Sequence, residues 1–258
     1  MIRGLRYAFG QTLAVDGVDL TVAPGEVFGL LGPNGAGKTT TIRAITTLLP
    51  VPAGTVCVFG LDVHSRKMAV RRLIGYVPQM LSADAALSGR ENVALFARLF
   101  DVPRARRRSL VAETIDAMGL TDAADRPAGT YSGGMIRRLE LAQALVSSPR
   151  LLILDEPTIG LDPVARTGVW ERIADVRART GMTVLLTTHY MEEAQEYCDR
   201  VALMHRGRIR AEGTPEELVA AVGGGSLDDV FRAHTGHDLQ EGGFRDVSAT
   251  RRTVRRLG

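Results

Sequence analysis

Residues 32–39 read Gly32-Pro33-Asn34-Gly35-Ala36-Gly37-Lys38-Thr39, a pattern of the form G-x-x-x-x-G-K-T. Glycines in such a segment let backbone N–H groups turn toward a bound phosphate, and the lysine adds a positive charge. The apolar run Val27–Leu31 precedes the segment and suits a buried strand, and residues 39–49 have the character of a helix. Strand, loop and helix in this order are the context that a phosphate-binding loop requires. The segment therefore predicts a nucleotide site in an α/β fold.

Each position of this loop has an expected contact with a nucleotide. Lys38 is expected to reach the β and γ phosphates, and Thr40 is expected to lie near the α-phosphate. The Thr39 hydroxyl is expected to ligate Mg²⁺, which prefers hard oxygen ligands. The helix that begins here points the positive end of its dipole at the nucleotide. The loop residues predicted to bind the nucleotide are Gly32, Pro33, Asn34, Gly35, Ala36, Gly37, Lys38, Thr39 and Thr40.

Two acids follow the unbroken apolar run at residues 151–154, which is typical of a strand buried on both faces of a parallel sheet. Asp155 stands at the carboxyl end of this strand and is the candidate to hold Mg²⁺ through water. Glu156 comes next and is placed to orient or deprotonate an attacking water molecule. A solvated turn is the alternative for a pair of acids at a strand end.

A histidine ends a third apolar strand, predicted at residues 183–186. His189 follows two threonines and precedes the acidic run at residues 190–194. A lone histidine is usually structural or simply exposed. This one stands at the same sheet edge as the phosphate loop, so a contact with the γ-phosphate is the better interpretation.

A second glycine-rich segment, Tyr131-Ser132-Gly133-Gly134-Met135, precedes a basic segment with apolar residues at helical spacing, residues 136–147. Together with the motifs above, it resembles the nucleotide-binding subunits of ATP-binding cassette (ABC) transporters. The resemblance runs from residue 9 to about residue 218. It implies an α/β fold, namely the P-loop NTPase core of ABC ATPases with a small antiparallel β subdomain and an inserted α-helical subdomain.

The resemblance also implies a dimer that binds ATP between its subunits. Ser132, Gly133 and Gly134 open a helix, and in the family this end receives the γ-phosphate bound by the other subunit. Two chains would therefore enclose two ATP molecules head to tail, and Asp162 belongs to the loop that crosses the dimer interface. Hydrolysis would remove the bridging phosphate and loosen the dimer.

Two further residues have roles implied only by the resemblance. Gln79 corresponds to the glutamine that ligates Mg²⁺ and senses both the γ-phosphate and the membrane partner. Phe9 corresponds to the aromatic residue that stacks on adenine. The metal ligands expected in this chain are Thr39, Gln79 and Asp155.

The second glycine-rich segment departs from the family's commonest form, which begins with leucine and ends with glutamine. Here Tyr131 and Met135 stand at those positions, so any polar contact of that glutamine is absent. This variant is similar to drug exporters of the daunorubicin-resistance type, as are residues 227–231 and 235–236. The resemblance therefore favours export of a drug or another hydrophobic compound.

The chain divides into two parts at Gly223-Gly224-Gly225. Residues 1–222 are expected to form the ATP-binding domain, in which a helical subdomain occupies about residues 88–150. Residues 223–258 are expected to be a glycine-rich linker and a short tail, partly disordered.

The composition excludes several other classes of protein. The 258 residues are 45% hydrophobic, and 32 basic and 29 acidic residues give a net charge of +3. Part of the basic excess lies in two clusters, at residues 104–108 and 251–256. The cluster at 104–108 is explained by a solvated helix face, and the cluster at 251–256 by a disordered tail. For both clusters, binding to anionic lipid headgroups is the alternative. No stretch is long and apolar enough to cross a bilayer, and no secretion segment is seen. Cys57 and Cys198 lack metal-binding or redox spacing.

The sequence thus predicts an ATPase, with ATP and Mg²⁺ as its cofactors, that powers export through a separate transmembrane permease subunit. In this hypothesis Glu156 is the base, and Lys38 and His189 act on the phosphate. The chain would be peripheral, at the cytoplasmic face of the membrane, and no nucleic acid partner is expected. The alternatives are an importer subunit, a soluble ABC ATPase acting on the ribosome or on DNA, and a nucleotide-binding regulator without turnover.

Overall fold

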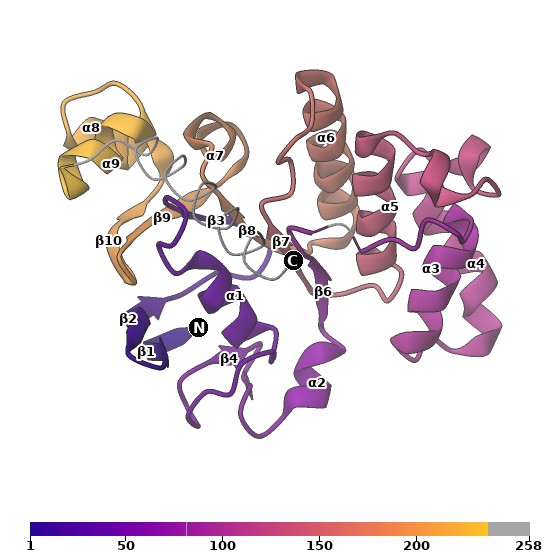
Figure 1. Cartoon of the computed structure of the whole chain (residues 1–258), viewed down its shortest axis with the longest axis horizontal. Coiled ribbons are helices and arrows are strands. Elements are labelled where there is room, and N and C mark those ends of the chain that lie inside the picture. The colour runs from indigo at the N-terminus through magenta and orange to yellow at the C-terminus, as the bar shows by residue number, and fades with distance from the viewer. Residues whose placement is uncertain (81, 237–258) are drawn as a thin grey trace, which may run out of the picture.

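The computed structural model describes residues 1–80 and 82–236, and a six-stranded sheet lies at its centre (Figure 1). The strand order is β10-β9-β3-β8-β7-β6, with β10 antiparallel to β9 and the other pairs parallel. Every residue of β3, β7 and β8 is buried, as expected where both faces of a parallel sheet are covered. The strands are β3 (Val27–Leu31), β6 (Ile74–Val77), β7 (Leu151–Asp155), β8 (Thr183–Thr188), β9 (Arg200–His205) and β10 (Arg208–Gly213).

Two small antiparallel sheets accompany the central one. The first pairs β1 (Ile2–Phe9) with β2 (Thr12–Leu20), and the second pairs β4 (Cys57–Val58) with β5 (Leu61–Asp62). The buried residues of β1 and β2 belong to the same hydrophobic cluster as Phe28 and Leu30 of β3. The predicted small antiparallel subdomain is thus confirmed, and it packs on one face of the central sheet.

The helices are distributed around the sheet; α3, α4 and α5 lie together at the right of Figure 1, where α5 also packs against β6 and α6. This group is the predicted helical subdomain. The helices are α1 (Lys38–Ile45), α2 (Lys67–Arg71), α3 (Gly89–Leu99), α4 (Arg104–Ala117), α5 (Gly133–Leu145), α6 (Pro163–Thr180), α7 (Met191–Tyr197), α8 (Pro215–Ala221) and α9 (Leu227–Thr235), with short 3-10 turns at Thr121–Ala123 and Ala128–Thr130.

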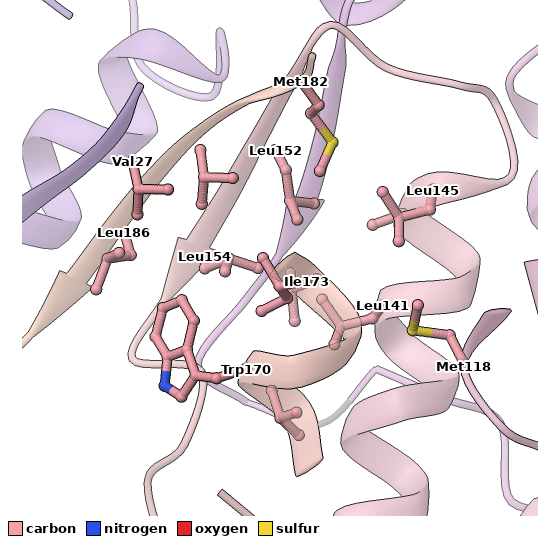
Figure 2. Close-up of a cluster of buried hydrophobic side chains, with 14 of the residues drawn as sticks. Val27, Met118, Leu141, Leu145, Leu152, Leu154, Trp170, Ile173, Met182 and Leu186 are labelled. Carbon is pink, nitrogen blue, oxygen red and sulfur yellow. The ribbon is translucent and has the colours of Figure 1, made fainter. Parts of the chain in front are cut away.

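Alternate side chains of the central strands point into two different hydrophobic clusters. Leu152 and Leu154 of β7 pack with helices α5 and α6, where Trp170 is 3% exposed, and Figure 2 shows this cluster. Ile153, between them, faces the opposite side and packs with α1 and the antiparallel strands. A strand buried on both faces has this period of two, and it explains the unbroken apolar run in the sequence.

One helix end differs from the sequence-based expectation, and one helix start agrees with it. The first helix begins at Lys38 and ends at Ile45 rather than at residue 49. The Thr46 N–H still bonds to the carbonyl of Ile42, but Thr47 takes a left-handed conformation with φ of 65°, and the helix ends there. Helix α5 begins at Gly133, as expected of a helix opened by Ser132, Gly133 and Gly134. Ser132 caps it, since its hydroxyl accepts a hydrogen bond from the Met135 N–H.

The segment after the three glycines continues as a packed helix. Leu227, Val230 and Phe231 of α9 are buried in the cluster that also contains the central strands. The division of the chain at residues 223–225 stays a prediction, and the tail at 237–258, with its basic residues 251–256, lies outside the described residues. Within the described ranges, none of the helices combines the length and the apolar character needed to cross a membrane.

Candidate active site

The phosphate loop is held in a conformation that only glycine adopts easily. Gly32 has φ of 151° and Gly37 has φ of 110°, both in the region that disfavours other residues. A Cβ on Gly32 would lie 2.1 Å from the carbonyl oxygen of Met204, and one on Gly37 would lie 2.6 Å from that of Ala14. The two glycines therefore let the loop pack directly against the backbone of neighbouring strands.

Helix α1 starts at the end of this loop with uncapped N–H groups. Gly37 is its N-cap residue, and no side chain accepts a hydrogen bond there. The first backbone N–H groups of a helix lack partners within the helix, and they carry the positive end of its dipole. This end of α1 is suited to a bound anion such as a phosphate.

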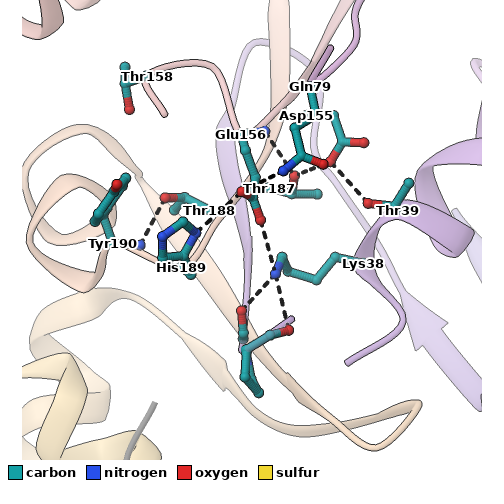
Figure 3. Close-up of polar contacts among 12 residues, drawn as sticks. Lys38, Thr39, Gln79, Asp155, Glu156, Thr158, Thr187, Thr188, His189 and Tyr190 are labelled. Carbon is teal, nitrogen blue, oxygen red and sulfur yellow. Dashed lines mark hydrogen bonds and ion pairs between the residues drawn. The ribbon is translucent and has the colours of Figure 1, made fainter. Parts of the chain in front are cut away.

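Lys38 is buried and faces into the concave side of the loop. Its Nζ donates to the carbonyl oxygens of Gly32 at 2.7 Å and Pro33 at 3.2 Å, and lies 3.4 Å from Oε1 of Glu156 (Figure 3). Only 4% of the lysine is exposed. Burial lowers its pKa, and the nearby Glu156 carboxylate opposes that change. The ammonium thus sits between the loop carbonyls and the acid that follows strand β7.

Glu156 is the point where three other predicted residues meet. Its carboxylate lies 3.2 Å from Nε2 of Gln79, which donates to it, and 3.3 Å from Nδ1 of His189 (Figure 3). The second of these is a close contact without the alignment of a hydrogen bond. The backbone at Glu156 has φ of 52°, an unfavourable conformation for a residue with a side chain. Such strain is typical of a residue held for its chemistry.

The surroundings keep Glu156 ionised at neutral pH. Burial alone would raise the pKa of this carboxyl, but His189 and Lys38 together lower it below the ordinary value of 4.5. A carboxyl with a lowered pKa stabilises the folded state above its ordinary pKa, and this stabilisation is lost as the pH falls through the lowered value. The site therefore presents an anionic oxygen that could accept a proton.

Asp155 lies beside Glu156 and is almost completely buried. Its Oδ1 accepts a hydrogen bond from the Thr187 hydroxyl at 2.5 Å and lies 3.4 Å from the Thr39 hydroxyl. The parallel register pairs Asp155 with Thr187, which explains why these side chains meet at the carboxyl ends of β7 and β8. Thr187 is one of the two threonines that precede His189, and no role was predicted for it.

A further buried acid, Glu193 of helix α7, was not predicted. Its carboxylate accepts hydrogen bonds from Thr158 at 2.5 Å, Trp170 at 2.7 Å and Thr188 at 3.0 Å. It thereby joins the loop after Glu156, helix α6 and the end of β8. In the sequence nothing distinguishes the buried Glu193 from its exposed neighbour Glu192 in the same acidic run.

We predict that Glu193→Ala strongly destabilises the fold. The substitution would leave three buried donors without an acceptor, and each such group costs about 1 to 3 kcal/mol. A loss of about 3 kcal/mol corresponds to a fall in Tm of roughly 6 to 12 °C for a domain of this size. Thermal unfolding followed by circular dichroism would measure it.

The neighbouring exposed Glu192 supplies a matched control for this change. Glu192→Ala is expected to move Tm very little, since surface substitutions usually change stability by less than about 0.5 kcal/mol. Equal Tm values for the two variants would contradict the structural role of Glu193.

The remaining predicted site residues lie away from this cluster. Ser132 and Asp162 cap α5 and α6, where Asp162 accepts a hydrogen bond from the Ala165 N–H at 2.9 Å. A Cβ on Gly134 would lie 2.9 Å from that of Ala165, so these two helix starts are neighbours. Among the described residues, no hydrogen bond or ion pair links Ser132, Gly133 or Gly134 to the Lys38 and Glu156 group. Phe9, at the end of β1, is 48% exposed.

Comparison with known proteins identifies the family. The model of the family described as ABC transporter matches residues 15–159. The daunorubicin/doxorubicin resistance ATP-binding protein DrrA of Streptomyces peucetius is 50% identical over 237 residues, which are 92% of this chain and 70% of that protein. A Nod factor export ATP-binding protein I from Paraburkholderia xenovorans (strain LB400) is 44% identical over 88% of this chain and 74% of that protein. The chain belongs to the ABC transporter family, as an ATP-binding subunit, and it is an ATPase.

Solved structures agree with this assignment. The structure of an ATP-binding subunit of an ABC transporter superposes with a TM-score of 0.80 at 28% identity, covering 91% of this chain and 98% of that one. A dimeric ATP-binding cassette in a post-hydrolysis state, bound to ADP and phosphate, superposes with a TM-score of 0.73 at 25% identity, covering 83% of this chain and 97% of that one. The predicted fold, with its ABC ATPase core, is confirmed.

Proposed function

We propose that this chain forms a head-to-tail dimer around two ATP molecules and powers export of a hydrophobic compound through a separate membrane subunit. The observation that carries the proposal is the division of the site. Lys38, Glu156 and His189 are assembled in one cluster, whereas the Ser132 end of α5 lies apart from it. A second chain would supply the missing helix end to each cluster.

The chemistry follows from the groups that meet at Glu156. Water attacks the γ-phosphorus in line, an O–P bond forms, and the bond from the γ-phosphorus to the bridging oxygen breaks. The Glu156 carboxylate accepts the proton of this water. Lys38 stabilises the charge on the phosphate oxygens, and His189 and the partner's Ser132 fix their position.

The residues present fit a magnesium ion bound together with the nucleotide. Asp155 and the Thr39 hydroxyl are hard oxygen donors 3.4 Å apart, and Gln79 stands beside them. The part of the chain that the structure describes holds no group of three or more His, Cys, Asp or Glu side chains able to bind a metal on their own. Mg²⁺ usually binds through one or two carboxylates plus substrate phosphates, and Asp155 supplies such a carboxylate. When bound, it would neutralise negative charge on the phosphates.

Export rather than import is supported by the relatives. The proteins similar to this chain include one named for daunorubicin and doxorubicin resistance and others named for Nod factor export. The Tyr131 and Met135 variant of the glycine-rich segment favours the same class. We infer that the chain acts as a peripheral protein at the cytoplasmic face of the membrane.

A crosslinking experiment tests the head-to-tail arrangement. Asn34→Cys and Ser132→Cys would be placed on separate chains in which Cys57 and Cys198 are replaced by alanine. With ATP and a short thiol crosslinker, the mixture is expected to give a covalent dimer on denaturing gels, because position 34 of one chain faces position 132 of the other. Each chain alone is expected to run as a monomer on the same denaturing gel, because it carries only one of the two cysteines that would face each other. Dimers from a single chain, or none from the mixture, would contradict the proposal.

A purification experiment tests the transport role. The chain would be isolated with ATP from the membranes of its source, and an integral membrane protein is expected to copurify. This chain and that membrane protein, reconstituted together in inside-out vesicles, should then take up a hydrophobic drug into the vesicle lumen when ATP is added. Copurification of ribosomes or DNA would support the soluble alternative, and ATP-driven release of a preloaded compound from those vesicles would support the importer.

A further inference from the structure

A buried ion pair lies one turn inside helix α5, after the Ser132 cap. Nη1 of Arg137 lies 2.9 Å from Oε2 of Glu140, and each residue is only 2% exposed. Burial lowers the pKa of Arg137 and raises that of Glu140, so both groups are strongly desolvated. A buried ion pair is weak evidence for stability, because apolar residues of similar volume often replace it without loss. The contacts of this pair point to another role.

Both members of the pair hold the backbone around Gln79. Arg137 donates to the carbonyl oxygen of Pro78 at 2.9 Å and to that of Gln79 at 3.4 Å. On the other side, Glu140 accepts hydrogen bonds from the Ser82 N–H at 2.5 Å and from the Ser82 hydroxyl at 3.2 Å. The pair thus contacts the chain at Pro78 and Gln79 and again at Ser82, three residues after Gln79.

The side chain of Gln79 extends this contact to the active site. Its Nε2 donates to Oε2 of Glu156 at 3.2 Å (Figure 3). A continuous set of contacts therefore runs from α5 through Arg137 and the Gln79 backbone to the proposed base. The same helix begins at Gly133, at the end that would receive the partner's nucleotide.

We propose that Arg137 and Glu140 are positioning residues for hydrolysis, which hold Gln79 against Glu156 and tie its position to that of helix α5. The inference rests on the proposed function, since it assigns the pair a role in the same reaction. Neither residue touches the phosphate loop, so their loss should affect turnover and not nucleotide binding. In a dimer, docking of the Ser132 end on the partner's nucleotide would set Gln79 in place through this pair.

A matched control lies on the same helix. Gln143 is 1% exposed and donates to Asn92 of α3 at 3.0 Å, where Asn92 in turn holds the backbone of Asp84. This second polar network is buried like the Arg137–Glu140 pair, and it also joins helix α5 to the segment that follows Gln79. It contacts neither Gln79 nor Ser82. Gln143→Met would remove a buried polar contact from α5 without releasing Gln79.

A double-mutant cycle in the full chain tests the proposal through kcat. Arg137→Met is expected to lower kcat about 10-fold with the KM for ATP unchanged within about twofold, since only a step after binding is affected. In a Gln79→Ala background the same change should alter kcat by less than about twofold, because residues that act through one group are not additive. Gln143→Met should leave kcat close to the wild-type value.

The proposal would be overturned if the effect of Arg137→Met on kcat did not depend on Gln79. If Arg137→Met lowered kcat equally with and without Gln79, or if Gln143→Met matched it, the pair would be merely structural. If Gln79→Ala kept full activity, positioning of Gln79 would have no consequence and the proposal would fail. Because removal of one partner leaves a charge buried, the variant Arg137→Met/Glu140→Gln repeats the cycle with both charges removed and the acceptor for Ser82 retained.

Amide hydrogen exchange separates this inference from the proposed function. A peptide covering residues 77–83, which excludes Asp84 and its bonds to Asn92, should exchange faster in Arg137→Met than in the wild type, and Gln143→Met should leave its exchange unchanged. This readout does not need hydrolysis. Absence of ATPase activity in the wild-type chain would overturn the proposed function. Unchanged amide exchange of this peptide in Arg137→Met would instead show that Arg137 and Glu140 do not hold the backbone at Gln79.

Discussion

Glu156→Gln is expected to abolish most ATP hydrolysis while ATP binding is retained. The substitution keeps the size of the side chain and an oxygen that can accept the hydrogen bond from Gln79. It removes the charge that His189 and Lys38 stabilise, and the amide cannot accept the proton of an attacking water. Because general base catalysis typically contributes about 10²- to 10⁴-fold, we expect kcat to fall by that factor. Phosphate release would measure the rate, and calorimetry the affinity.

The same variant should accumulate an ATP-bound dimer. Without hydrolysis the γ-phosphate would continue to bridge the two chains, so size-exclusion chromatography with light scattering should show twice the chain mass when ATP and Mg²⁺ are present. Glu171→Gln, an exposed change on α6, is the control and should behave like the wild type. Hydrolysis by Glu156→Gln at more than about a tenth of the wild-type rate would refute Glu156 as the base.

The sequence predicted the clustered half of the site because topology alone brings it together. Parallel strands end at a common edge, so residues directly after β3, β6, β7 and β8 must lie near one another. The register bears this out, since Leu31 pairs with Thr188 and Asp155 with Thr187. Lys38, Asp155 and His189 could therefore be assigned to one site from apolar runs and the residues that end them.

Contacts that depend on side-chain packing could not be predicted in this way. Glu193 and Arg137 lie in helices, where a charged residue usually faces solvent. Nothing in the local pattern shows that one would be buried against Trp170 and the other against the carbonyl of Pro78. Burial of a polar group depends on which helix packs where, and that is a property of the complete fold.

The predicted end of the first helix was wrong for a related reason. Hydrophobic periodicity continues through residue 49, but the left-handed backbone of Thr47, with φ of 65°, ends the helix at Ile45. At the second glycine-rich segment, periodicity begins only at residue 136, and the predicted opening by Ser132, Gly133 and Gly134 places the helix start at Gly133. A single cap or a single left-handed residue thus overrides the periodic pattern at the end of an element.

Lys38→Ala is expected to weaken ATP binding by at least about 100-fold. Interactions with a charged group contribute about 1.5 to 3 kcal/mol each, and the ammonium could reach two phosphates, which together correspond to such a change in Kd. The chain contains one other lysine, Lys67, which is exposed on α2, so Lys67→Ala is a control that removes the same group from the surface. Calorimetric titration with ATP would compare the two variants.

The lysine substitution also separates binding from folding. Lys38→Ala leaves the carbonyl oxygens of Gly32 and Pro33 without their donor, so some loss of stability is expected and Tm must be measured beside affinity. Removing the positive charge should also raise the pKa of Glu156, because Lys38 is one of the groups that lower it. A folded Lys38→Ala chain with the wild-type Kd for ATP would show that the phosphate loop does not bind nucleotide through its lysine.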